Sequence, residues 1–248
     1  MKKIKVAAVS YLNTKPLLYG FERNGFINSI DLVQDFPARI AAMLLNDEID
    51  IGLVPVAVIS ENKAFHIVSD YCIGSLNEVA SVCLFSEVPI EQIETVILDY
   101  QSRTSVQLCK ILLKHFWKKH VIFKNAELDF RNQISGTTAA VVIGDRAFEQ
   151  RLTSPFVYDL AASWKDFTGL PFVFAAWVAN KKIDEAFLLK FNEANAYGLQ
   201  NIAEVVSKID YPLYDLKTYY TQNISYNFDA LKQKGLNTFL NYLKESDQ

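Results

Sequence analysis

Short apolar runs alternate with amphipathic segments along the first 150 residues of the chain. Residues 4–9 are apolar and β-branched, as in a strand buried on both faces, whereas Leu17, Leu18 and Phe21 recur at helical spacing after Pro16. The same order returns later, with an apolar strand over 96–98, a hydroxyl-rich loop and an amphipathic helix over 106–117. Strands that alternate with helices of about a dozen residues predict parallel βαβ units.

Each half of this pattern continues in the same way. The first half has a strand over 29–36, a helix over 37–48 with Asn46 placed to end it, and a strand over 49–59 that breaks at Pro55. The second half has strands over 120–125 and 138–148, and the latter breaks at Gly144 and Asp145. The repetition predicts two similar α/β lobes.

Two further apolar segments, 80–86 and 170–180, bracket the second half. If both cross between lobes, residues 1–85 form a first lobe, residues 86–174 an inserted second lobe, and residues 175–248 return to the first lobe with a helical C-terminal tail. The expected fold is α/β and two-lobed, with mainly parallel sheets. Ligands of such sheets bind at the carboxyl ends of the strands, so we expect a cleft between the lobes, and hinge closure through the two crossing segments.

Two polar loops would form opposite walls of this cleft. The first contains Ser10, Asn13 and Thr14, and the second contains Ser102, Thr104 and Ser105. Each precedes a helix N-terminus, which favours an anion, and the hydroxyl and amide groups add neutral donors. The alternative is that Asn13 or Thr14 merely caps its helix, and spacing alone leaves both interpretations open.

Composition excludes several classes of protein. The 248-residue chain is 50% hydrophobic, which suffices for a full core, and its net charge of −3 gives no electrostatic footprint for nucleic acid. No apolar run reaches the roughly 18 residues of a membrane span, and the basic start leads into a strand rather than a signal peptide, so we expect a cytoplasmic protein. Cys72, Cys83 and Cys109 form no CxxC motif and are expected to be buried free thiols.

Catalytic signatures are scarce. His66, His115 and His120 have no metal-binding spacing and are expected at solvated positions, and no GxSxG, GxGxxG or P-loop motif occurs. Asp145 follows a strand at the expected cleft, where it could act as a base or cap a helix. A cleft of neutral donors suits a small molecule that carries a carboxylate. Composition and spacing leave open whether the protein is an enzyme or a solute-binding protein.

Six separated motifs carry a resemblance to a known family: "VSYLNTKPL", "LLNDEIDIGLVPV", "EVASVCLFS", "DYQSRTS", "VVIGDRAF" and "YDLAASWKDFTGLPFVFAAWV". Together they resemble chorismate dehydratase, the first enzyme of the futalosine route to menaquinone. The resemblance implies a type II periplasmic-binding-protein-like fold. It also implies conversion of chorismate to 3-[(1-carboxyvinyl)oxy]benzoate by loss of water, with no metal or organic cofactor.

The resemblance also suggests site residues. The family's active-site asparagine and serine fall on Asn13 and Ser81, and its hydroxyl loop falls on Ser102, Thr104 and Ser105. With Ser10, Thr14, Pro55, Gly144 and Asp145 at the expected cleft, these form the predicted substrate-binding set. One departure is Ala80, which stands where the family often has a basic residue before the serine.

Two other functions remain as alternatives. The sister family that makes 1,4-dihydroxy-6-naphthoate in the same pathway shares the fold, but this chain reads Gly144-Asp145-Arg146 where that family has a catalytic histidine. A solute-binding protein of a transporter would need export. The sequence gives no indication of the oligomeric state.

Overall fold

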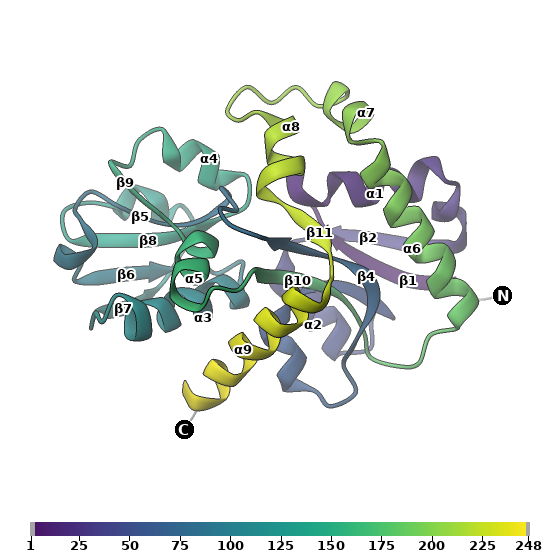
Figure 1. The fold of residues 1–248 in the computed structure, drawn as a ribbon, viewed down its shortest axis with the longest axis horizontal. Coiled ribbons are helices and arrows are strands. Elements are labelled where there is room, and N and C mark those ends of the chain that lie inside the picture. Colours follow the sequence, from purple (N-terminus) through teal and green to yellow (C-terminus); the bar gives the residue numbers. More distant parts are fainter. Residues whose placement is uncertain (1–2, 247–248) are drawn as a thin grey trace.

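The computed structural model describes residues 3–246. Its strands are β1 (Ile4–Val9), β2 (Ile30–Asp35), β3 (Ile51–Pro55), β4 (His66–Ser75), β5 (Val82–Ser86), β6 (Thr95–Leu98), β7 (Ile122–Asn125), β8 (Thr138–Ile143), β9 (Phe156–Asp159), β10 (Phe172–Ala179) and β11 (Ser225–Asn227). They form a six-stranded sheet in the order β11-β4-β10-β3-β1-β2 and a five-stranded sheet in the order β7-β6-β8-β5-β9. Figure 1 shows the two sheets as separate lobes, which confirms the two-lobed α/β fold.

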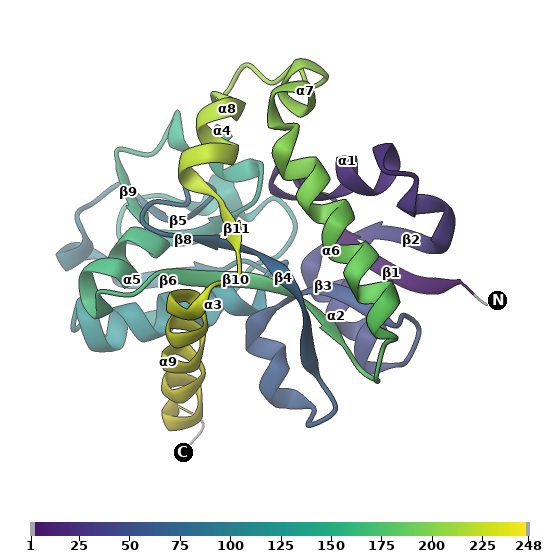
Figure 2. The same ribbon diagram turned by 45° about the vertical axis from the view of Figure 1, so that its right-hand side comes forward.

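Helices cover both sheets. They are α1 (Lys15–Arg23), α2 (Pro37–Leu45), α3 (Arg103–Ile111), α4 (Arg146–Arg151), α5 (Leu160–Thr168), α6 (Glu185–Gln200), α7 (Ile202–Ser207), α8 (Leu216–Thr218) and α9 (Ala230–Ser246). The predicted helix over 106–117 is realised as α3 followed by a π-helical turn over Leu112–Phe116. The C-terminal helix α9 packs on β10 of the first lobe and on α3 of the second, as Figure 2 shows from the side.

The βαβ pattern read from the sequence is present in both lobes. In the first, β1 pairs in parallel with β2 and β3, and in the second, β6 pairs in parallel with β7 and β8. The helix over 37–48 ends at Leu45 with Asn46 as its C-cap, as predicted. These units place the loops that follow β1, β3, β6 and β8 at the boundary between the lobes.

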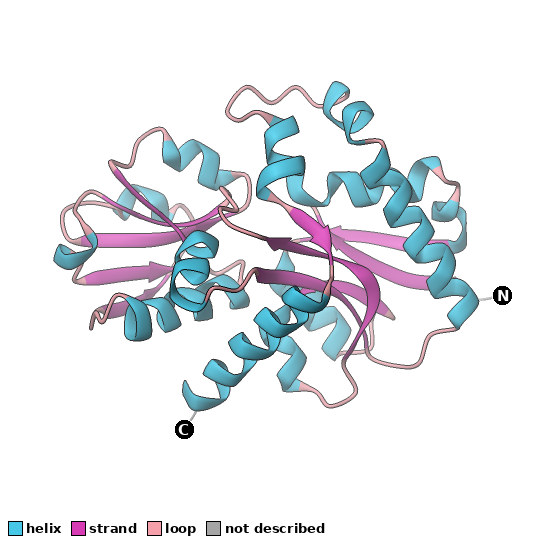
Figure 3. Ribbon diagram, in the orientation of Figure 1, coloured by secondary structure: helices cyan, strands magenta, loops and turns pink. Residues whose placement is uncertain are grey.

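The expectation of mainly parallel sheets is wrong, because both sheets are mixed (Figure 3). β10 runs antiparallel to β3 and β4, β11 runs antiparallel to β4, and β5 runs antiparallel to β8 and β9. The reason is the route of the chain. β5 and β10 follow the two crossings between lobes, so each begins at the cleft and runs away from it, whereas β3, β6 and β8 end there.

The structure also locates the two crossings. The chain leaves the first sheet at the end of β4, enters the second at the start of β5, and returns through the short segment between α5 and β10. The predicted lobe limits at residues 85 and 174 fall inside β5 and β10 rather than in these connections.

Two glycines fix the position of α1, whose N-terminus carries the first polar loop. A Cβ at Gly20 would lie 1.8 Å from the carbonyl oxygen of Ala194, and a Cβ at Gly198 would lie 1.8 Å from that of Pro16. Only glycine permits this approach of the α1 and α6 backbones. The close crossing anchors α1 in the first lobe beside the cleft.

Candidate active site

A small cavity of about 50 Å³ lies between the lobes, where the strands of both sheets meet. The structure brings five of the predicted residues to its wall, namely Asn13, Pro55, Ser102, Ser105 and Gly144. The remaining wall is mostly apolar and includes Ile73 of β4, Val82 of β5 and Phe174 of β10. An apolar cavity with a few convergent polar groups is the usual form of a small-molecule site.

Asn13 supplies the amide of the first-lobe wall. Its Oδ1 accepts a hydrogen bond from the Thr14 hydroxyl at 3.1 Å, and its carbonyl accepts one from the Tyr226 hydroxyl at 2.9 Å. Within residues 3–246 its Nδ2 has no hydrogen-bond partner, so this nitrogen is available to a ligand. Neither Asn13 nor Thr14 caps a helix through its side chain, so the capping alternative for this loop is wrong.

Two other predicted residues of the first loop do not reach the cavity wall. Thr14 is fully buried and its hydroxyl is engaged with Asn13. Ser10 is exposed, and its N–H donates to the carbonyl of Asp35 at 3.3 Å. Of the polar residues predicted here, the structure therefore brings Asn13 alone to the cavity.

The second-lobe wall is the N-terminus of α3. The Ser102 hydroxyl oxygen accepts from the N–H of Ser105 at 3.1 Å and lies 2.9 Å from the Ser105 hydroxyl, so Ser102 is the N-cap of this helix. The first N–H groups of a helix lack partners within it and carry partial positive charge, which favours an anion. Ser102 therefore both caps α3 and lines the cavity.

The side chains of Thr104 and Asp145 accept hydrogen bonds from the first lobe and do not line the cavity. The Thr104 hydroxyl, fully buried, accepts from the N–H of Ala57 at 3.1 Å. The Asp145 carboxylate accepts from the N–H of Leu12 at 3.1 Å and makes no capping bond to its own helix. Burial raises the pKa of Asp145, and the Leu12 N–H opposes this shift.

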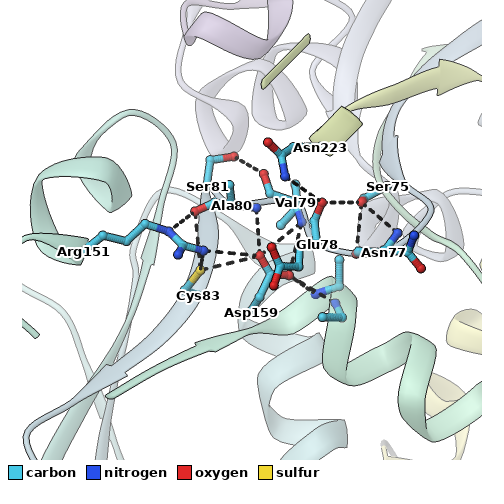
Figure 4. A network of polar contacts seen from close by, with 12 residues as sticks. Ser75, Asn77, Glu78, Val79, Ala80, Ser81, Cys83, Arg151, Asp159 and Asn223 are labelled. Carbon is cyan, nitrogen blue, oxygen red and sulfur yellow. Dashed lines mark hydrogen bonds and ion pairs between the residues drawn. The ribbon is translucent and has the colours of Figure 1, made fainter. Parts of the chain in front are cut away.

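Ser81 is the last residue of the connection between β4 and β5. A buried hydrogen-bond network holds the residues before it in place (Figure 4). The Asp159 carboxylate accepts from the N–H of Ala80 at 2.8 Å, and the Arg151 guanidinium donates to the carbonyl of Ala80 at 2.8 Å. Ala80 has a φ of 63°, a left-handed conformation that is uncommon for alanine. The network therefore fixes a strained backbone immediately before Ser81.

The side chain of Ser81 does not line the cavity. It is fully buried, and its hydroxyl accepts a hydrogen bond from the Tyr219 hydroxyl at 2.7 Å. The next residue, Val82, lines the cavity instead. The structure therefore places Ser81 beside the cavity without bringing its hydroxyl to the wall.

Tyr11 lines the cavity and is absent from the set of site residues predicted from the sequence. Its hydroxyl donates to Gln101 Oε1 across the cleft. Gly144 lies under its ring with a φ of +66°, and a Cβ there would lie 3.1 Å from three ring carbons. The sequence marks Tyr11 only as an aromatic residue inside a polar loop. Its partner, Gln101, could not be inferred from spacing because it lies 90 residues away.

A larger hollow of about 490 Å³ lies outside this cavity and shares Ser102 with it. It is lined by both acidic and basic groups, including Glu61 and Arg103, which form an ion pair at 2.8 Å. We take the inner cavity as the site because the ends of β1, β3 and β8 and the loop after β6 all contribute to its wall. Neither β1 nor β8 reaches the outer hollow, where Glu61 and Arg103 neutralise each other.

The remaining sequence expectations concern thiols, histidines and membrane spans. All three cysteines are buried and free, as predicted. His66 and His120 are exposed, but His115 is partly buried with its ring 5.0 Å from that of Tyr242. Across residues 3–246 no cluster of His, Cys, Asp or Glu could hold a metal ion. The helices in this part of the chain are all too short or too polar to cross a bilayer.

The sequence profile of the family described as "Menaquinone biosynthesis" matches residues 4–245. The chain belongs to this family. Two curated relatives are named chorismate dehydratase. That of Thermus thermophilus is 26% identical, covering 92% of this chain and 91% of its own. That of Campylobacter jejuni is 26% identical, covering 91% of both chains.

The fold of this family member is also found among transport proteins. The periplasmic aliphatic sulphonate binding protein of Escherichia coli superposes with a TM-score of 0.65 at 12% identity, covering all of this chain and 93% of that one. At this identity the likeness concerns the fold alone. It confirms the periplasmic-binding-protein-like architecture.

The buried Ser81–Tyr219 pair leads to a first prediction. Ser81→Ala leaves a buried phenol without its partner, so we expect a loss of about 1–3 kcal/mol in the free energy of unfolding. Adding Tyr219→Phe removes the second polar group, and the double variant should lose less than the sum of the single losses. Urea unfolding of the four proteins measures this coupling, and strictly additive losses would contradict the pairing.

Proposed function

We propose that this protein is a chorismate dehydratase, a carbon–oxygen lyase that converts chorismate to 3-[(1-carboxyvinyl)oxy]benzoate and water. The observation that carries the proposal is the match to two chorismate dehydratases over about nine tenths of each chain. The site supports it, because an amide and the N-terminus of a helix face one cavity. Placement in the cytoplasm is part of this proposal.

The chemistry requires donors more than it requires a strong base. The proton that leaves chorismate lies on the ring carbon that bears the enolpyruvyl ether, and its removal spreads charge onto the ring carboxylate. Donors at that carboxylate stabilise the developing charge, and loss of the neighbouring hydroxyl then gives an aromatic ring. Asn13 supplies an amide donor to the cavity wall, and Ser102 and Ser105 bring the N-terminus of α3 to it. The proposed elimination needs no cofactor.

Two groups are candidates to accept the proton, the enolpyruvyl carboxylate of the substrate and Asp145. The Asp145 carboxylate is bonded to the Leu12 N–H and is not part of the cavity wall. This arrangement favours the carboxylate of the substrate. A catalytic role for Ser81 rests on the family resemblance, and it requires the serine hydroxyl to leave Tyr219 and turn toward the substrate.

The cavity must enlarge to admit chorismate. Its volume of about 50 Å³ is far below the roughly 300 Å³ at which small-molecule pockets begin. Opening at the connections that follow β4 and α5 would separate the two walls without disturbing either sheet. We therefore propose that substrate enters an open form and that the lobes close around it.

Incubation of the purified protein with chorismate tests the proposed function. We expect an aromatic ultraviolet spectrum to develop and the mass of the product to be lower than that of chorismate by one water. Chorismate binding without turnover would instead indicate a solute-binding protein. No interaction with chorismate would contradict the proposal and leave the naphthoate-forming alternative to be tested.

Asn13 should matter in the transition state. Asn13→Leu keeps the side-chain volume but removes the free amide donor, and loss of one positioned donor typically lowers kcat by about 10² to 10³. Steady-state kinetics measures the effect. The control is Asn28→Leu, an exposed position away from the cavity, which should leave kcat unchanged. Near-normal turnover of Asn13→Leu with an intact melting curve would remove Asn13 from the mechanism.

A further inference from the structure

The side chain of Tyr11 lines the cavity and also bridges the two lobes. It lies in the loop after β1, and its hydroxyl donates to the side-chain oxygen of Gln101, in the loop after β6. Its ring lies against Gly144 at the end of β8, where a Cβ would lie only 3.1 Å from the ring carbons. Tyr11 is thus part of the cavity wall and spans the cleft at the same time.

Hydrogen bonds within the second lobe orient Gln101 so that its side-chain oxygen can accept from Tyr11. The N–H of Gln101 donates to the Asp99 carboxylate at 3.0 Å, and Arg146 donates to Gln101 Oε1 at 2.8 Å. The Gln101 amide nitrogen in turn donates to the Tyr100 hydroxyl at 3.1 Å. Because arginine can only donate, its contact identifies the Gln101 oxygen, and the Tyr11 phenol must be the donor.

The other hydrogen bonds across the cleft differ in kind. Asp145 and Thr104 accept from the backbone N–H groups of Leu12 and Ala57. The Tyr211 hydroxyl donates to the carbonyl of Asp145, and Arg103 forms an ion pair with Glu61. None of the first-lobe groups in these contacts adds a side chain to the cavity wall. Tyr11 alone of these contacts couples closure to the shape of the cavity. Tyr11→Phe would keep the ring over Gly144 and remove only the bond to the second lobe.

We propose that Tyr11 is a positioning residue that holds the lobes closed over the substrate through its bond to Gln101. Closure brings the Asn13 wall and the α3 wall together, so it determines how tightly the substrate is held. The kinetic consequence rests on the proposed function, whereas the effect on lobe closure does not. Burial raises the pKa of the Tyr11 phenol further above neutral pH, so the group remains a hydrogen-bond donor.

Small-angle scattering of the ligand-free protein tests the closure directly. We expect Tyr11→Phe to have a larger radius of gyration than the unmodified protein, because a bond that favours the closed form is lost. The matched control is Tyr100→Phe, which removes a hydroxyl bonded to the same glutamine within the second lobe, and it should leave the radius unchanged. Gln101→Leu removes the bond from the other side and should reproduce the increase. A radius for Tyr11→Phe equal to that of the unmodified protein would overturn the proposal.

Kinetics with chorismate provides the second measurement. Tyr11→Phe removes a hydrogen bond that should be equally strong in the substrate complex and in the transition state. We therefore expect KM to rise about 2- to 10-fold and kcat to change less than about twofold. A tenfold fall in kcat at constant KM would place the phenol at the reacting atoms and overturn the positioning role. If the unmodified protein does not convert chorismate, the proposed function fails while the scattering result still decides whether Tyr11 closes the lobes.

Discussion

The direction of the strands is the constraint on which the rest of the structure depends. The parallel units of both lobes end their strands at the cleft, so the loops after β1, β3, β6 and β8 all meet there. The two crossing strands must then begin where these strands end, which makes them antiparallel and supplies the apolar wall. One geometric rule thus places both the polar donors and the hydrophobic surface of the cavity.

Three carboxylates around the cleft already have hydrogen-bond or ion-pair partners within the protein. Asp99 pairs with Arg146 at 2.7 Å, and Asp159 accepts from four backbone N–H groups on the crossing segment and α5. Asp145 is bonded to the first lobe. Their negative charges are therefore compensated, although the chain as a whole is acidic. The cavity presents an amide and a helix N-terminus instead, which suits an anionic ligand.

Sequence patterns predicted the local units well because these depend on periodicity and on proline, glycine and asparagine at element ends. β1, α1 and α2 agree with their patterns to within a few residues. β4 was missed because its first half mixes exposed polar residues with apolar ones, and it becomes a strand by pairing with β10. The hydroxyl loops were identified, but the partners of Thr104, Ser81 and Tyr11 lie 47, 138 and 90 residues away. Such contacts depend on how the lobes pack, which no local pattern encodes.

The central claim is that the cavity between Asn13 and the N-terminus of α3 holds the substrate. A crystal structure with bound 3-[(1-carboxyvinyl)oxy]benzoate tests it most directly. The account predicts the ligand between the two lobes, with a carboxylate within hydrogen-bond distance of the Asn13 amide or the first turn of α3. A ligand bound in the outer hollow beside Glu61 and Arg103, with the inner cavity unchanged, would contradict it.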